Sequence, residues 1–334
     1  MLAASKDELC ALPLDERPRL VVVIDTEEEF DWSKDFSRSN TSVKAMRHIH
    51  AVQEVFDRYG ITPVYVVDYP IVSHPDGYEP LQEILSSGRC VIGVHLHPWV
   101  SPPFREEVNR RNSFPGNLPY DLEAEKLRCL RERIQECFGI RPTIYKAGRY
   151  GIGQSTAQIL LDQGFEVDLS VCPFMDYSQE GGPDFSGSSY SPYWIVRDRL
   201  LEIPLTVGFS GLLRRWGQGV HRLASAPALA PCRPVGVLAR LGLVNKVWLS
   251  PEGFLSPEHI RLTKDLYADG LRVFSFAFHS PSVVPGHTPY VSSRADLDEF
   301  LARCDRYFDF FLGKLGGCPT TPIELKRVFS SVTT

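Results

Sequence analysis

The sequence has no long hydrophobic run. No part of its 334 residues approaches the ~18 consecutive apolar residues of a membrane span, and its first 20 residues lack the apolar core of a secretory signal. Charge imbalance is also small, because 36 basic residues stand against 41 acidic ones, which gives no support for nucleic-acid binding. The eight cysteines form no CxxC pair. We therefore expect reduced thiols and a cytoplasmic protein, not a disulfide framework.

The sequence does contain a regular alternation of strand-like and helix-like segments. Several apolar runs are hydrophobic on both faces, and segments with apolar residues at helical spacing separate them. The strand-like runs are LVVVID, ITPVYVV, RCVIGVH, IRPTIYKAG, FEVDLSV, RLLEIPLTV and LRVFSFAFH. Such a pattern is typical of parallel strands covered by helices, and it predicts a barrel-like α/β domain.

No repeat or linker divides the chain, so we predict one domain over residues 19–330, preceded by an extension over 1–18. An insertion is expected at about 173–250, where a Gly/Ser/Pro-rich stretch leads into a segment without acidic residues, 208–250. Its basic residues are Arg214, Arg215, Arg222, Arg233, Arg240 and Lys246. Uncompensated cations mixed with apolar residues favour an anionic membrane surface or a phosphate-bearing glycan carrier. The alternative is a flap packed on the barrel with its arginines in water.

Polar side chains follow three of the predicted strands. Asp25 ends the first strand and begins an acidic stretch, His95 and His97 end the third, and His279 ends the last. Since the carboxyl ends of parallel strands face the ligand, these residues predict a site at one edge of the sheet. Side chains two apart on a strand point the same way, so both histidines of HLH can reach one ion. A carboxylate from the first strand would complete a site for one divalent metal ion.

Five segments also carry a resemblance to a known family. They are VVVIDTEEEFDW, VIGVHLHPW, IYKAGRYG, FEVDLSVCPF and FSFAFHSP. In this order they resemble the motifs of the polysaccharide deacetylase family (NodB-homology, carbohydrate esterase family 4), and more narrowly its WalW-like branch. The resemblance spans most of the chain and implies a distorted (β/α)7 barrel, here with an inserted basic flap. It also implies one divalent metal, often zinc, and hydrolysis of N- or O-acetyl groups on glycans. We therefore expect a deacetylase of surface polysaccharide or lipopolysaccharide assembly, acting on a glycan or glycolipid. The basic segment 208–250 adds the expectation of contact with the inner face of the membrane.

The first two motifs depart from the family pattern. Trp99 stands where the family has its second histidine, so His97 would have to substitute for it. Asp25 replaces an adjacent pair of aspartates, which leaves Glu27 or Glu28 as the metal carboxylate. Glu27 shares the face of Asp25 if the strand continues, whereas a turn would present Glu28 instead.

The resemblance also implies roles for residues around the metal. Asp25 would be the base that takes a proton from water, and His279 the acid that protonates the leaving amine or alkoxide. Lys146 aligns with an arginine of the family, and either it or Arg149 would pair with Asp25 and keep it ionised. The remaining candidates are Trp99 and Tyr150, for stacking on sugar rings, and Asp168, for orienting other groups at the substrate site.

Two other functions stay open from the sequence. A glycan-binding barrel without catalysis would fit the displaced second histidine and the lysine in place of arginine. The joint presence of Asp25, His95, His97 and His279 argues against it. An amidohydrolase acting on another C–N bond also uses an HxH motif, but on the first strand, whereas here the motif follows the third.

Overall fold

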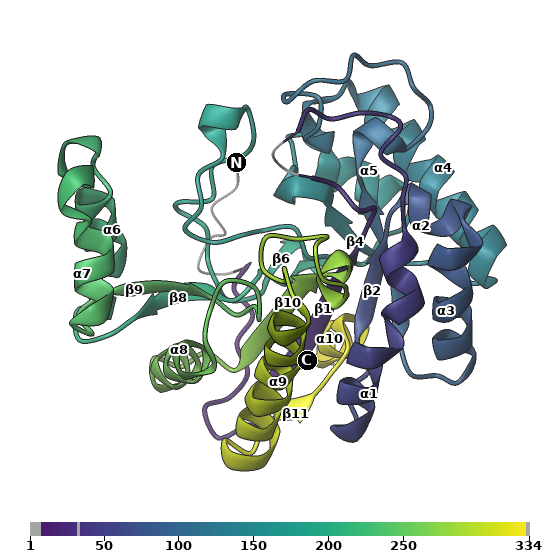
Figure 1. Cartoon of the computed structure of the whole chain (residues 1–334). Coiled ribbons are helices and arrows are strands. Elements are labelled where there is room, and N and C mark those ends of the chain that lie inside the picture. The colour runs from purple at the N-terminus through teal and green to yellow at the C-terminus, as the bar shows by residue number, and fades with distance from the viewer. Residues whose placement is uncertain (1–7, 32–33, 332–334) are drawn as a thin grey trace.

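A single curled sheet forms the centre of the molecule (Figure 1). The computed structural model describes residues 8–31 and 34–331. Its strand order is β10-β1-β2-β3-β4-β5-β7-β6, and all neighbours are parallel except β6 and β7. The seven parallel strands are β1 (Arg19–Thr26), β2 (Val64–Val67), β3 (Val91–Leu96), β4 (Ile144–Ala147), β5 (Val167–Asp168), β7 (Leu200–Glu202) and β10 (Val273–His279). β6 (Tyr193–Val196) lies at one edge, and the short β11 (Cys318–Pro319), off this path, pairs in parallel with the start of β1. The predicted parallel α/β architecture is confirmed, with seven parallel strands along the main path of the nine-stranded sheet.

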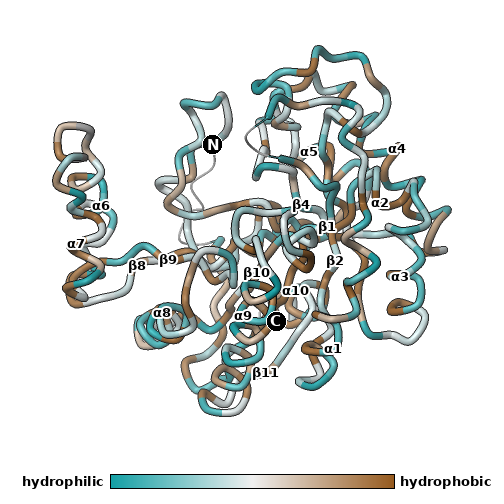
Figure 2. Tube along the Cα trace, in the orientation of Figure 1, coloured by the Kyte–Doolittle hydropathy of each residue, from teal (hydrophilic) through white to brown (hydrophobic). Residues whose placement is uncertain are grey.

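Helices cover the outer face of this sheet (Figure 1). They are α1 (His50–Arg58), α2 (Tyr69–Ser73), α3 (Pro75–Ser86), α4 (Tyr120–Phe138), α5 (Thr156–Asp162), α8 (Ser256–Ala268) and α9 (Arg294–Phe308). The last helix, α10 (Pro322–Ser331), packs against the interior core of the barrel instead. Figure 2 shows hydrophobic and hydrophilic residues alternating along α8 and α9, as expected of helices with one buried face. No helix of residues 8–31 and 34–331 is both long enough and apolar enough to span a bilayer.

Alternation along the strands creates two hydrophobic cores. In β1, Leu20, Val22 and Ile24 pack outward against the helices, whereas Val21 and Val23 point into the barrel interior. Because both sets are fully buried, each strand reads as a nearly continuous apolar run in the sequence. The interior set, Val21 and Val23, continues to Asp25 at the carboxyl end of β1.

The barrel is not closed by direct pairing of β7 with β10 in the described chain. Single hydrogen bonds bridge the gap instead. The backbone N–H of Leu249 donates to Thr206 O (2.9 Å), and that of Ala277 donates to Leu249 O (3.1 Å). The N–H of Ser275 donates to Thr206 Oγ1 (2.8 Å). The result is a partly open barrel, which agrees with the distorted barrel that the family resemblance implies.

The predicted insertion at 173–250 is interrupted by β7, which belongs to the main sheet. The part that projects is shorter, and we call residues 207–248 the arm. It consists of the hairpin of β8 (Val207–Ser210) and β9 (Asn245–Trp248), which carries α6 (Gly217–Ala224) and α7 (Pro234–Arg240) away from the barrel (Figure 1). Of the predicted extension 1–18, residues 1–7 lie outside the described chain, and Cys10 N–H bonds to Pro192 O beside β6.

Candidate active site

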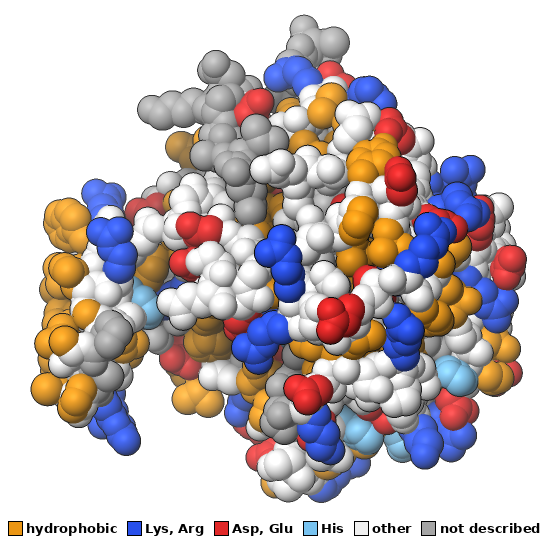
Figure 3. Space-filling view, turned by 90° about the horizontal axis from the view of Figure 1, so that it is seen from above, with side chains coloured by type: hydrophobic (Ala, Val, Ile, Leu, Met, Phe, Trp, Pro, Cys, Tyr) orange, Lys and Arg blue, Asp and Glu red, His pale blue; other side chains and the backbone are white. Residues whose placement is uncertain are grey.

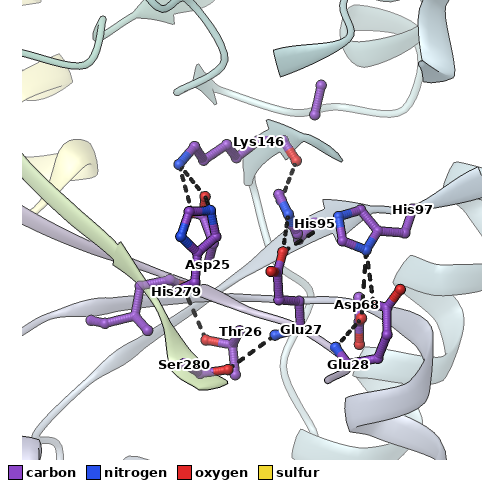
Figure 4. Close-up of polar contacts among 12 residues, drawn as sticks. Asp25, Thr26, Glu27, Glu28, Asp68, His95, His97, Lys146, His279 and Ser280 are labelled. Carbon is purple, nitrogen blue, oxygen red and sulfur yellow. Dashed lines mark hydrogen bonds and ion pairs between the residues drawn. The ribbon is translucent and has the colours of Figure 1, made fainter. Parts of the chain in front are cut away.

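Four polar side chains lie on the interior face of the barrel at the carboxyl ends of their strands (Figure 4). Alternate residues of β1 point inward, and the period of two that begins at Val21 places Asp25 on that face. Asp25 is paired in register with His279 of β10, and His95 of β3 is paired with Lys146 of β4. Strand register therefore brings residues far apart in the sequence to one level of the barrel.

His95, His97 and Glu27 converge on one point. Glu27 Oε2 lies 3.4 Å from His95 Nε2 and 3.5 Å from His97 Nε2, and all three side chains are buried. His95 Nδ1 is 3.0 Å from the carbonyl of Lys146, and His97 Nδ1 is 2.8 Å from Glu28 Oε2. Since each Nδ1–H donates outward, each Nε2 presents its lone pair toward Glu27.

The protonation states at this point suit a cation. Burial lowers the pKa of His97, so its imidazole is neutral, and its Nε2 has no hydrogen-bond partner within the described residues. Burial by itself would raise the pKa of Glu27, but the neighbouring histidines outweigh it and the pKa lies below its ordinary value. An ionised carboxylate beside the unpaired Nε2 of a neutral imidazole is a suitable ligand set for a divalent ion.

Glu28 lies on the other side of His97 and holds that ring in place. It accepts hydrogen bonds from His97 Nδ1 and from Trp99 Nε1 (2.8 Å), while its backbone N–H donates to Asp68 (2.9 Å). Burial raises the pKa of Glu28 to about 7. Burial, and then a hydrogen bond to Glu28, holds the pKa of Asp68 well above its usual range. Glu28, Asp68 and His97 are also near enough to one another to bind an ion. Their facing atoms are already joined by hydrogen bonds, so this second group orients His97 for the first group, Glu27, His95 and His97.

Asp25 and Lys146 form a buried ion pair. Lys146 Nζ lies 2.6 Å from each carboxylate oxygen of Asp25, and both side chains are almost inaccessible. Burial by itself would raise the pKa of Asp25, but Lys146 and the neighbouring histidines together hold it below its ordinary value. Asp25 is therefore ionised at neutral pH and can accept a proton.

His279 carries the opposite charge. Its Nδ1 lies 2.8 Å from Glu252 Oε2, its backbone N–H donates to Glu252 Oε1, and its Nε2 is 3.8 Å from Asp25 Oδ2. Burial by itself would lower the pKa of His279, but Glu252, Glu27 and Asp25 raise it to about 10. The protonated His279 can therefore donate a proton, while the neighbouring ionised Asp25 can accept one.

A cavity of about 490 Å³ opens over these residues. Its walls are largely aromatic, with Tyr150, Tyr177, Trp248, Phe254 and Tyr290 around the polar floor. Aromatic walls above a few charged groups are common in sites that bind sugar rings, because rings stack on apolar faces while hydroxyl groups reach polar ones.

Solved structures share this architecture, although no family model matches the sequence and no curated protein matches it. A protein of Mycobacterium smegmatis, named as a candidate polysaccharide deacetylase, has a TM-score of 0.57 at 13% identity, over 98% of this chain and 95% of that one. Another, from Pseudomonas aeruginosa PAO1 and likewise named as a candidate, has a TM-score of 0.51 at 14% identity, over 92% and 89%. This chain has the polysaccharide deacetylase fold. Identity this low shows the fold and not the activity.

Within this deacetylase fold, three predicted site residues lie elsewhere than expected. Trp99 cannot stack on a sugar, because it is 1% exposed and packs against His97 with ring centroids 4.3 Å apart. Arg149 does not reach Asp25: its φ of 53° turns it aside to pair with Glu180. Asp168 is buried and does not line the cavity.

Asp168 instead supports the strand that carries Lys146. Ser170 Oγ donates to Asp168 and accepts the backbone N–H of Ala147 (2.8 Å). Burial raises the pKa of Asp168 to about 7, and Glu202, whose pKa burial also raises, shares a hydrogen bond with it. Tyr150 does line the cavity, with Lys146 Nζ 5.3 Å from its ring centre.

Sequence reasoning missed three residues of the site. Asp68 follows the strand-like run VYVV directly, so the rule applied to the other strand ends would have found it. Ser280 Oγ accepts the N–H of Glu27 (3.2 Å) and comes next to His279 in the closing motif. Glu252 lies in a loop after β9 and has no sequence signal, because only the folded chain brings it to His279.

Proposed function

We propose that this protein is a metal-dependent hydrolase that removes N- or O-acetyl groups from a glycan or glycolipid. The observation that carries the proposal is the position of the ligand set Glu27, His95 and His97 beside a pair formed by an ionised Asp25 and a protonated His279. The shared fold and the aromatic cavity agree with a sugar substrate. Surface polysaccharide or lipopolysaccharide assembly, a cytoplasmic location and placement in the WalW-like branch remain predictions.

The donor set fits a divalent ion of the zinc type. Two imidazoles and one carboxylate leave positions free for water or substrate, as in catalytic zinc sites. An ion there supplies Lewis-acid polarisation of the acetyl carbonyl and makes water more acidic. The structure itself contributes the unpaired Nε2 of His97, the outward-bonded Nδ1 atoms and the ionised Glu27.

The proton transfers are carried by residues of this chain. Asp25, kept ionised by Lys146, accepts a proton from the attacking water. His279, kept protonated and oriented by Glu252, donates a proton to the departing amine or alkoxide. Because Nε2 of His279 lies within 3.8 Å of Asp25, both groups can act on one small acetyl centre in the cavity.

The metal content of the purified protein tests the site directly. We expect about one divalent ion per chain in the wild type, and none in His95→Ala or in Glu27→Gln, which keeps the size of the side chain. Acetate release from N-acetylglucosamine oligomers and O-acetylated xylan should fall with the metal in both variants. His50→Ala, a partly exposed histidine that pairs with Glu83, is the matched control and should keep both. Equal metal content in wild type and both variants would refute the ligand set.

Replacing Glu252 by glutamine should move the alkaline limit of activity to lower pH. Glu252 helps to raise the pKa of His279 to about 10, so removing its charge lowers that pKa and His279 loses its proton sooner as pH rises. The measurement is the pH profile of kcat/KM for acetate release by the metal-loaded enzyme. An unchanged alkaline limb with reduced overall rate would mean that Glu252 only positions the ring.

A further inference from the structure

The arm presents an unusually hydrophobic surface. Twelve large hydrophobic side chains are exposed on the described chain, and six of them fall within residues 212–241. They are Leu212, Trp216, Leu223, Leu229, Val237 and Leu241. The side chains of Trp216 and Leu223 are 67% and 69% exposed, so this surface has no partner within the described molecule.

Basic residues run beside these hydrophobic ones on both arm helices. Trp216 and Leu223 are seven residues apart, and so are Arg215 and Arg222, which places two parallel rows along α6 and the turn before it. Around α7, Arg233 and Arg240 repeat the spacing next to Val237 and Leu241. Figure 3 shows hydrophobic side chains at the arm end of the molecule with basic side chains on either side.

Within the described part of the chain, three of the six basic residues of 208–250 are free to meet an external anion. Arg214 is bound by Asp269, 3.0 Å away at the base of the arm, and Arg215 reaches the same carboxylate only at 3.7 Å. Arg222, Arg233 and Arg240 are exposed and form no ion pair within residues 8–31 and 34–331. Residues 208–250 contain no acidic side chain that could neutralise them.

We propose that the arm docks the protein on an anionic lipid surface, with Trp216 and Leu223 entering the headgroup region and the arginines contacting lipid phosphates. A basic, apolar helix pair of this kind lies in the plane of a membrane interface without spanning it. A second copy of the chain is a poorer occupant, because a two-fold contact sets the same patch against itself and would bring arginines against arginines. The proposal does not depend on the deacetylase activity.

Docking would also place the cavity close to the lipid surface. β9 connects the arm helices to Trp248, which lines the cavity. A four-residue strand is roughly 13 Å long. A lipid-linked glycan could therefore reach the cavity from the surface on which the arm rests.

Vesicle sedimentation of the full-length protein tests the proposal. With vesicles of phosphatidylcholine containing roughly a third phosphatidylglycerol, we expect binding at about 0.05 M salt that is lost at about 0.5 M. Phosphatidylcholine alone should bind far less. Arg215→Glu with Arg222→Glu should weaken binding at least about 25-fold, or roughly 5-fold for each arginine lost. Trp216→Ala with Leu223→Ala should weaken it as well, because buried apolar area is removed.

Matched controls lie outside the arm. Leu14 is 67% exposed and Arg294 has a side chain that is 78% exposed, so Leu14→Ala and Arg294→Glu should leave vesicle binding unchanged. No binding to anionic vesicles at low salt, or equal loss in these controls, would overturn the proposal. So would a stable dimer in solution that Trp216→Ala with Leu223→Ala dissociates, since this would assign the surface to a second copy. Acetate release from a soluble substrate, measured on the same variants, separates failure of the membrane-docking proposal from failure of the proposed deacetylase activity.

Discussion

Replacing His279 by alanine is expected to slow acetyl release by roughly 10²–10⁴-fold while the metal content stays at the wild-type level. The reason is that His279 holds the proton for the leaving group but does not belong to the group of Glu27, His95 and His97. Acetate release under substrate saturation and metal content of the same preparation are the two measurements.

Three outcomes for His279→Ala are distinguishable. Loss of rate with retained metal agrees with a general acid, and simultaneous loss of both would make His279 a ligand instead. An unchanged rate would refute the proposed mechanism. His50→Ala provides the surface control, and thermal unfolding of both variants checks that the fold is retained. If the wild type releases acetate from no acetylated glycan yet keeps its metal, the glycan-binding barrel becomes the better function.

Replacing Lys146 by methionine is expected to destabilise the protein by about 3–5 kcal/mol at neutral pH. Lys146 and Asp25 are 1% and 4% exposed, so the substitution leaves a buried carboxylate without its strongest partner. Denaturant unfolding of the metal-free protein measures the loss. Asp25→Asn in the Lys146→Met background should recover much of it, because no buried charge is then left unpaired.

The pH dependence gives the Lys146→Met prediction a second test. In the wild type the pKa of Asp25 is lowered, so its contribution to stability is lost as pH falls through that lowered pKa. Without Lys146, burial raises the pKa of Asp25 above its ordinary value, so the variant gains stability relative to the wild type as pH falls. The difference in unfolding free energy should therefore shrink between about pH 7 and about pH 4. A constant difference would show that lost packing, not the lost charge, destabilises the variant.

Much of the site followed from patterns within single strands. The alternation of apolar residues in β1, β3 and β10 determines which residues face the barrel interior, and that set includes Asp25, His95 and His279. Because parallel strands end at one edge, the sequence was enough to predict that these residues meet. Lys146 was proposed from its alignment with an arginine of the deacetylase family, and the structure places it on the fourth strand opposite His95.

The choice among neighbours was decided only by the tertiary structure. β1 ends at Thr26, and beyond a strand end the period of two no longer says where a side chain points. Packing against β2 and β3 then directs Glu27 to the metal position and Glu28 behind His97. Arg149 could not be assigned to Glu180 from its motif, since that depends on a left-handed backbone and on a loop 31 residues away.

Glu252 shows the same limit at longer range. It is 27 residues from His279, in a loop without strand or helix periodicity. Its carboxylate nevertheless accepts hydrogen bonds from the backbone N–H and from the ring Nδ1 of His279. The sequence by itself determined the sheet, its interior face and the strand ends, because these depend on local burial patterns. Which carboxylate orients, which binds and which accepts a proton was decided by tertiary contacts, because a pKa and a hydrogen bond depend on what the fold brings within a few ångströms.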